Sequence, residues 1–136
     1  MIESYLEDII LSISESSCIE SFEVIKKKVT STDGYLRLKA NLINQDLLEI
    51  SVYCQKKLTT VELIDYRYHW QDESEVLKMR WDSCPHHKDI KNFPFHVHLN
   101  DLTVSSSEKM EVYKILEFIE KNIKGQTDMR SPKNPD

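Results

Sequence analysis

Histidine is the residue type whose placement most strongly suggests chemistry in this chain. The 136-residue sequence contains five histidines, and all of them fall between positions 69 and 98. They are His69, His86, His87, His96 and His98. Because the ordinary pKa of histidine lies near neutral pH, this side chain serves as a general acid, a general base or a metal ligand. The clustering therefore predicts a site in this part of the chain.

Two arginines and one aspartate accompany the histidines. Arg67 precedes His69 by two residues, and Arg80 and Asp82 follow after a short polar turn that would make a hairpin. Opposite residues of such a hairpin lie ~5 Å apart. A metal-independent ribonuclease needs a base for the ribose 2′-hydroxyl, an acid for the leaving oxygen and a cation for the phosphate. The arginines would bind phosphate, and Asp82 would orient a histidine.

The predicted site has two parts. Catalysis is assigned to His69, Arg80, Asp82, His87 and His98. Substrate binding is assigned to Arg37, Lys39, Arg67, His86 and His96. We expect neither a metal nor another cofactor in it.

A metal site is the alternative for the same histidines, with Asp82 as a further ligand. On a strand, His96 and His98 point the same way and could ligate together, whereas the adjacent His86 and His87 point apart. No cysteine pair assists, and the spacing fits no fixed metal-binding pattern. A loop histidine is also often a plain surface residue, so a third possibility is that these histidines have no functional role.

The elements that must position these residues follow from the hydrophobic period. Apolar residues recur every three or four positions over 2–15, which predicts an amphipathic helix. Apolar and polar residues alternate over 36–42, 48–54, 60–71 and 77–82, which predicts strands with one buried face. On the long strand this pattern places Ile64, Tyr66, Tyr68 and Trp70 toward the core, so we assign these aromatic rings to packing rather than to base stacking.

The remaining segments are less regular. Residues 83–107 have neither period and predict a loop, with a short strand at 95–99. Ser105–Ser107 and Glu108 predict the cap of a second helix, which Gly125 would end. Together these elements predict an α+β fold, an antiparallel meander of about five strands covered on one face by an N-terminal and a C-terminal helix. Residues 1–124 would form one domain and 125–136 a flexible tail.

Composition excludes several classes of function. With only two glycines, the chain lacks the glycine-rich loops that bind nucleotide phosphates through backbone groups. The net charge of -5 equals the charge of residues 1–20, so the remainder is neutral and does not argue against a nucleic-acid partner. Three cysteines without a CxxC pair predict a reduced, cytoplasmic protein, and no apolar run is long enough to cross a membrane.

Three motifs resemble one known family. They are YRYHWQ at 66–71, RWDSCPHH at 80–87 and FPFHVH at 93–98. In this order and spacing they resemble the TumE family of small prokaryotic toxins, over about residues 2–123. By position, the resemblance marks His69, Arg80, Asp82, His86, His87, His96 and His98. Phe95 stands where a histidine is common in the family, which removes one candidate metal ligand, and Ser83 and Cys84 replace the family's Asn and Ala.

The resemblance implies the toxin of a type II toxin–antitoxin pair. Its expected partners are a helix-turn-helix antitoxin protein and RNA, with a homodimer as a further expectation and no membrane. Action on RNA rests on analogy with other such toxins and agrees with the histidine and arginine set. The alternatives are a non-enzymatic module that binds protein or nucleic acid and, third, a metal-dependent hydrolase.

Overall fold

The protein is described by a computed structural model that covers residues 1–84 and 93–130, with side chains up to residue 124. Its elements are α1 (Ile2–Glu15), β1 (Ile19–Val29), β2 (Asp33–Leu42), β3 (Leu47–Lys56), β4 (Val61–Gln71), β5 (Leu77–Asp82), β6 (His96–Leu99), β7 (Val104–Ser106) and α2 (Val112–Arg130). No helix within these ranges has the length and apolar character needed to span a membrane.

The strands form one antiparallel sheet in which spatial order follows sequence order from β1 to β7. This confirms the predicted α+β meander, although the described residues contain seven strands rather than about five. The short strand predicted at 95–99 is β6, whereas β7 lies in a segment that the sequence predicts to be a loop. Short strands of this kind depend on pairing with their neighbours more than on local pattern.

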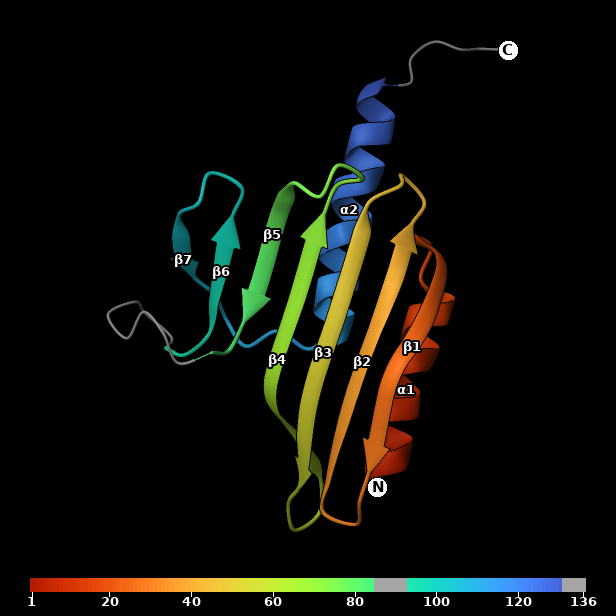
Figure 1. Ribbon diagram of the computed structural model, residues 1–136, viewed down its shortest axis with the longest axis vertical. Helices are drawn as coiled ribbons and strands as arrows, with labels where there is room; N and C mark the ends of the chain where they lie inside the picture. The colour runs from red at the N-terminus through yellow and green to blue at the C-terminus, as the bar shows by residue number, and fades with distance from the viewer. Residues whose placement is uncertain (85–92, 131–136) are drawn as a thin grey trace.

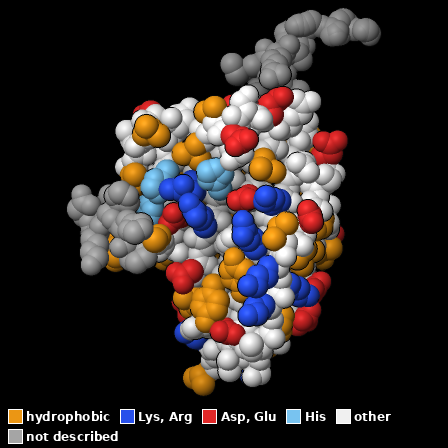
Figure 2. Space-filling view, in the orientation of Figure 1, with side chains coloured by type: hydrophobic (Ala, Val, Ile, Leu, Met, Phe, Trp, Pro, Cys, Tyr) orange, Lys and Arg blue, Asp and Glu red, His pale blue; other side chains and the backbone are white. Residues whose placement is uncertain are grey.

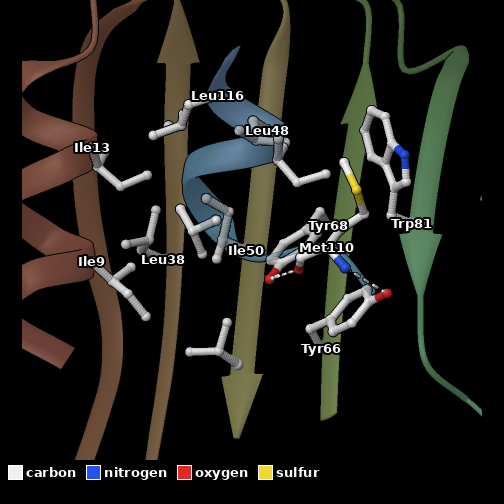
Figure 3. Close-up of a cluster of buried hydrophobic side chains, with 14 of the residues drawn as sticks. Ile9, Ile13, Leu38, Leu48, Ile50, Tyr66, Tyr68, Trp81, Met110 and Leu116 are labelled. Carbon is white, nitrogen blue, oxygen red and sulfur yellow. Dashed lines mark hydrogen bonds between the residues drawn. The ribbon is translucent and has the colours of Figure 1, made fainter. Parts of the chain in front are cut away.

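Both helices lie behind the sheet and leave its other face uncovered (Figure 1). The core between them is built from the inward residues of the strands and the apolar stripes of α1 and α2. In Figure 3, Ile9 and Ile13 of α1 approach the sheet from one side, while Leu116 of α2 lies behind the central strands. Phe118 extends the core toward the later strands, because its ring packs edge-on against that of Trp81, with the ring centres 5.4 Å apart.

Strand β4 departs from the predicted alternation at one point. The pairing of β3 with β4 shifts between Tyr53 and Cys54, where a β-bulge adds a residue to β4. As a result Leu63, not Ile64, is the buried residue before Tyr66. The prediction that Ile64 shares the core face was therefore wrong, whereas Tyr66, Tyr68 and Trp70 are buried as expected.

Helix α2 also differs from the prediction at both ends. Ser105 and Ser106 belong to β7 rather than to a helix cap, and α2 begins only at Val112. The helix continues through Gly125 to Arg130, so Gly125 does not end it. Residues 131–136 of the predicted tail lie outside the described residues, and the tail stays a prediction.

A buried carboxylate ties the β2–β3 turn to the later strands. Asp46 Oδ2 accepts hydrogen bonds from Trp70 Nε1 at 2.9 Å, from Asn44 Nδ2 at 3.0 Å and from Lys78 Nζ at 2.6 Å. The Lys78 ammonium also lies 5.2 Å from the centre of the Trp70 ring. Because a buried charge is tolerated only when it is paired and hydrogen-bonded, this network fixes the turn against β4 and β5.

Candidate functional site

The helix-free face of the sheet carries the candidate site. On β4, β5 and β6 the motifs supply the pairs Arg67 and His69, Arg80 and Asp82, and His96 and His98. The strands are in register, so these pairs form two rows across the sheet. Figure 2 views this face and shows a band of Lys and Arg side chains with histidines at one end. Three short motifs from three separate strands thus become one surface.

The first row runs through His69, Arg80 and His98, which are direct cross-strand partners. On the other side it continues from His69 to Glu49 of β3 and Lys39 of β2. Opposite residues of antiparallel strands project to the same face, and neighbouring strands lie about 4.8 Å apart. An arginine therefore stands between two imidazoles in one line.

The second row lies two residues along the strands. It joins Arg67, Asp82 and His96, and continues from Arg67 to Ser51 and Arg37. Its outer part is exposed, but Asp82 and His96 are buried, with exposed fractions of 6% and 0%. The row thus passes from a solvated basic end to a desolvated acid and imidazole, where electrostatic interactions are stronger.

Asp82, His96 and His98 form a compact cluster at the buried end. His96 Nε2 lies 3.1 Å from His98 Nε2 and 3.4 Å from Asp82 Oδ1, while His98 Nε2 lies 3.9 Å from Asp82 Oδ2. The Cys84 backbone N–H donates to Asp82 Oδ1 at 2.7 Å and holds the carboxylate in place. Arg80 Nε lies 3.7 Å from Asp82 Oδ2. It is buried and has no hydrogen-bond partner among the described residues.

His69 and the basic residues occupy the more open part of the face. His69 Nε2 lies 2.9 Å from Gln71 Oε1, and this contact restrains the ring. Glu49 lies 3.5 Å from Lys39 Nζ and 3.9 Å from an Arg37 guanidinium nitrogen, so it partly neutralises both. Arg67 is exposed on β4 between these residues and the buried cluster.

Two adjoining grooves lie on this face, and each is lined by residues of both rows. One, of about 880 Å³, is lined by residues that include Arg37, Lys39, Arg67 and His69. The other, of about 540 Å³, is lined by residues that include Arg67, Arg80, Asp82 and His98. Arg67 belongs to both grooves and joins them. Tyr35 and Ser51 are shared as well. Sequence reasoning missed Tyr35, although its place two residues before Arg37 on β2 was a usable signal.

The opposite side of β4 holds the site in position. Tyr66 and Tyr68 stack with their ring centres 4.9 Å apart. The Tyr68 hydroxyl donates to the Met110 carbonyl at 2.9 Å, and the Met110 N–H donates to the Tyr66 hydroxyl at 3.2 Å (Figure 3). Burial raises the pKa of Tyr66 to about 12, an increase that the Met110 N–H partly offsets. Burial also raises the pKa of Tyr68, so both rings stay neutral and anchor the strand that carries Arg67 and His69.

The predicted site residues divide into three groups. His69, Arg80 and His98 meet in one row, and Arg67, Asp82 and His96 meet in the next. Arg37 and Lys39 lie further out on the same face and line one groove with His69. His86 and His87 lie outside the described residues, so their part in the site stays a prediction.

The fold and the site define a class of protein: an α+β domain with a histidine, arginine and aspartate site on the open face of its sheet. A family model described as Toxin TumE matches residues 6–127, most of the chain. The chain therefore belongs to the TumE toxin family, which confirms the resemblance and supports a toxin-like function. Searches of curated proteins and of solved structures found no match to the chain.

Proposed function

We propose that this protein is the toxin of a toxin–antitoxin pair and that it cleaves RNA on the helix-free face of its sheet. The observation that carries the proposal is the row in which Arg80 separates His69 from His98. Membership of a toxin family supports the biological role. The chemistry is supported by the residue types, because phosphodiester cleavage needs proton transfer beside a cation that stabilises the charged phosphate.

His69 is the proposed general base. It lies in the open groove beside Arg67, where a ribose can approach its ring. In the proposed step, His69 takes the proton of the 2′-hydroxyl, the 2′-oxygen bonds to phosphorus, and the bond from phosphorus to the 5′-oxygen breaks. The products are a 2′,3′-cyclic phosphate and a 5′-hydroxyl, which takes its proton from a water molecule in the groove, while the proton held by His69 is released to solvent. Arg67 and Arg80 would hold the phosphate, and the Asp82 cluster would lie on the leaving-group side.

Arg37 and Lys39 are the proposed binding residues for the rest of the strand. Both line the groove that contains His69, and both are about half exposed. A flexible single strand would follow this groove through its phosphates, with little dependence on base sequence. Glu49 between them limits the affinity, which suits a substrate that must leave after cleavage.

The test uses the purified full-length protein with end-labelled single-stranded RNA, beside growth of cells that express it. Wild type is expected to leave 2′,3′-cyclic phosphate ends, and His69→Ala should lower the rate by about 100-fold or more. The matched control is Lys121→Ala, because Lys121 is exposed on α2 in the other layer. Absence of RNA cleavage by wild type, or growth arrest that persists in His69→Ala, would overturn the proposal.

The binding-module alternative predicts the reverse pattern for the same variants. Growth arrest would survive His69→Ala and fall in a double variant of Arg37→Ala and Lys39→Ala. An antitoxin partner, which we expect to contain a helix-turn-helix, is tested separately by co-expression with the neighbouring gene. Rescue of growth together with co-purification supports the pair, and rescue without a complex argues against direct binding.

A further inference from the structure

The Asp82, His96 and His98 cluster has the donor set and the spacing of a metal site. One ligating atom from each residue lies within 4.8 Å of the others. Ligands placed tetrahedrally at the usual zinc distances are separated by about 3.3 to 3.4 Å. His96 Nε2 is 3.1 Å from His98 Nε2 and 3.4 Å from Asp82 Oδ1, which matches two edges of such a tetrahedron.

The third distance, between His98 and Asp82, is longer and involves the most exposed residue of the cluster. His98 Nε2 is 3.9 Å from Asp82 Oδ2, the second oxygen of the carboxylate. His98 is also the most exposed of the three, with 20% of its side chain accessible. A small rotation of its ring would shorten this edge, while the buried His96 and Asp82 stay in place.

The orientation of His96 supports the same conclusion. Its Nδ1 lies 2.9 Å from the Pro94 carbonyl oxygen, which can only accept a hydrogen bond. This contact assigns the hydrogen to Nδ1, so in the neutral ring the electron pair of Nε2 is directed at His98 and Asp82. A ligating histidine commonly donates its other ring N–H to a carbonyl in this way, which fixes the tautomer and the ring.

Arg80 indicates what the open coordination position would face. Its Nε is buried without a hydrogen-bond partner among the described residues, 3.7 Å from Asp82 Oδ2. Arg80, Asp82 and His98 all line the 540 Å³ groove, so the cluster opens on that side. A cation and an unused donor beside the open side favour an anionic group such as a phosphate as the additional ligand.

We propose that Asp82, His96 and His98 bind one divalent transition-metal ion of the zinc type, with a fourth position on the side of Arg80 that none of the described residues fills. Two imidazoles and one carboxylate are a ligand set that zinc enzymes use, with solvent or substrate in the remaining position. The site assigns His98 as a ligand, which revises the expectation of a metal-free site. It would lie within the proposed RNA-cleaving face, but metal binding is measured without RNA, so either proposal can fail alone.

The experiment titrates untagged, metal-stripped full-length protein with Zn²⁺ by calorimetry and records the visible absorption of the Co²⁺ form. We expect one equivalent per chain and a tetrahedral Co²⁺ spectrum. Asp82→Asn and His98→Gln should weaken binding by at least about 100-fold, the upper end of what loss of a supporting contact costs. His69→Gln and Cys84→Ser are the matched controls and should bind as wild type does.

Thermal unfolding separates loss of the site from loss of the fold. A ligand that binds only the folded state raises Tm, so Zn²⁺ should raise the Tm of wild type and of both controls. It should leave the Tm of Asp82→Asn and His98→Gln unchanged, while these variants still unfold cooperatively. Wild-type protein that binds no stoichiometric Zn²⁺, or binding that persists unchanged in both ligand variants, would overturn the proposal.

Discussion

Two aspartates of this sheet are almost equally buried, yet their surroundings differ. Asp46 is 5% exposed and Asp82 is 6% exposed. One oxygen of Asp46 accepts three hydrogen bonds, all of 3.0 Å or less, from an indole, an amide and an ammonium group. Asp82 accepts a backbone N–H at 2.7 Å, and its imidazole and guanidinium neighbours lie between 3.4 and 3.9 Å away.

The difference teaches how to separate a structural carboxylate from a functional one. Asp46 Oδ2 accepts close hydrogen bonds from the β2–β3 turn, β4 and β5, so the network locks those elements together. Asp82 has ionisable neighbours and a groove on one side, and the adjacent Arg80 Nε lacks a partner among the described residues. Both residues are buried, so burial does not separate them, whereas the number of close hydrogen-bond donors around each carboxylate does.

Replacing each aspartate by asparagine should give the largest difference between the two sites, measured as the rate of RNA cleavage. Asp82→Asn should lower RNA cleavage by about 100-fold or more, because an amide neither orients nor ligates as a carboxylate does. Asp46→Asn should keep wild-type activity in protein that remains folded. Cleavage rates of the two purified variants provide the measurement. Equal losses of activity would show that the difference in surroundings carries no functional meaning.

The same two variants should show the opposite order in their free energies of unfolding. Asp46→Asn is expected to lower the free energy of unfolding by about 1–3 kcal/mol, since it leaves the Lys78 ammonium and the Trp70 N–H poorly paired. Asp82→Asn should cost less than about 1 kcal/mol in metal-free protein, because among the described residues only the Cys84 N–H makes a hydrogen bond of normal length to Asp82. Urea unfolding measures both, and a larger loss in Asp82→Asn would contradict the structural role given to Asp46.

A smaller effect is expected at the exposed cations that surround the buried centre. Arg37 and Lys39 are exposed and share Glu49, so each should contribute to RNA binding only through phosphate charge. Removing one such contact lowers the slope of log affinity against log salt by about 0.7 for a single strand. Binding of labelled RNA to Arg37→Ala and Lys39→Ala at several salt concentrations measures this slope. A slope identical to that of the Lys121→Ala control would exclude them from the interface.

Much of the fold could be predicted because apolar and polar residues alternate clearly along β2, β3 and β5. The assignment of Ile64 failed because a β-bulge adds a residue and reverses the alternation, and nothing local marks it. The helix cap predicted at Ser105–Ser107 failed because Val104–Ser106 pairs with β6 instead. In that case a contact between strands overrode a local preference for a cap.

The site could be predicted only as far as one hairpin extends. The short turn between β4 and β5 makes them a hairpin, so Arg67 and His69 could be placed across from Arg80 and Asp82, although which residues face each other needed the structure. The connection from β5 to β6 is long and has no period, so the sequence could not place His96 beside Asp82. That placement depends on sheet pairing, which brings the short strand of His96 and His98 beside β5 and makes both histidines parts of one cluster with Asp82.

The smallest expected effect concerns the buried hydroxyls behind the site, which contrast with the ionisable groups in front of it. Burial raises the pKa of Tyr66 to about 12, above its usual value near 10. Between about pH 10 and pH 12, the Tyr66 hydroxyl loses its proton in the unfolded chain but keeps it in the folded protein. Stability from this group is therefore full below pH 10 and declines as pH rises toward 12. Urea unfolding at several pH values should show a shallower alkaline decline in Tyr66→Phe than in wild type. Parallel declines would place the alkaline sensitivity elsewhere, in Tyr68 or in the lysine ion pairs.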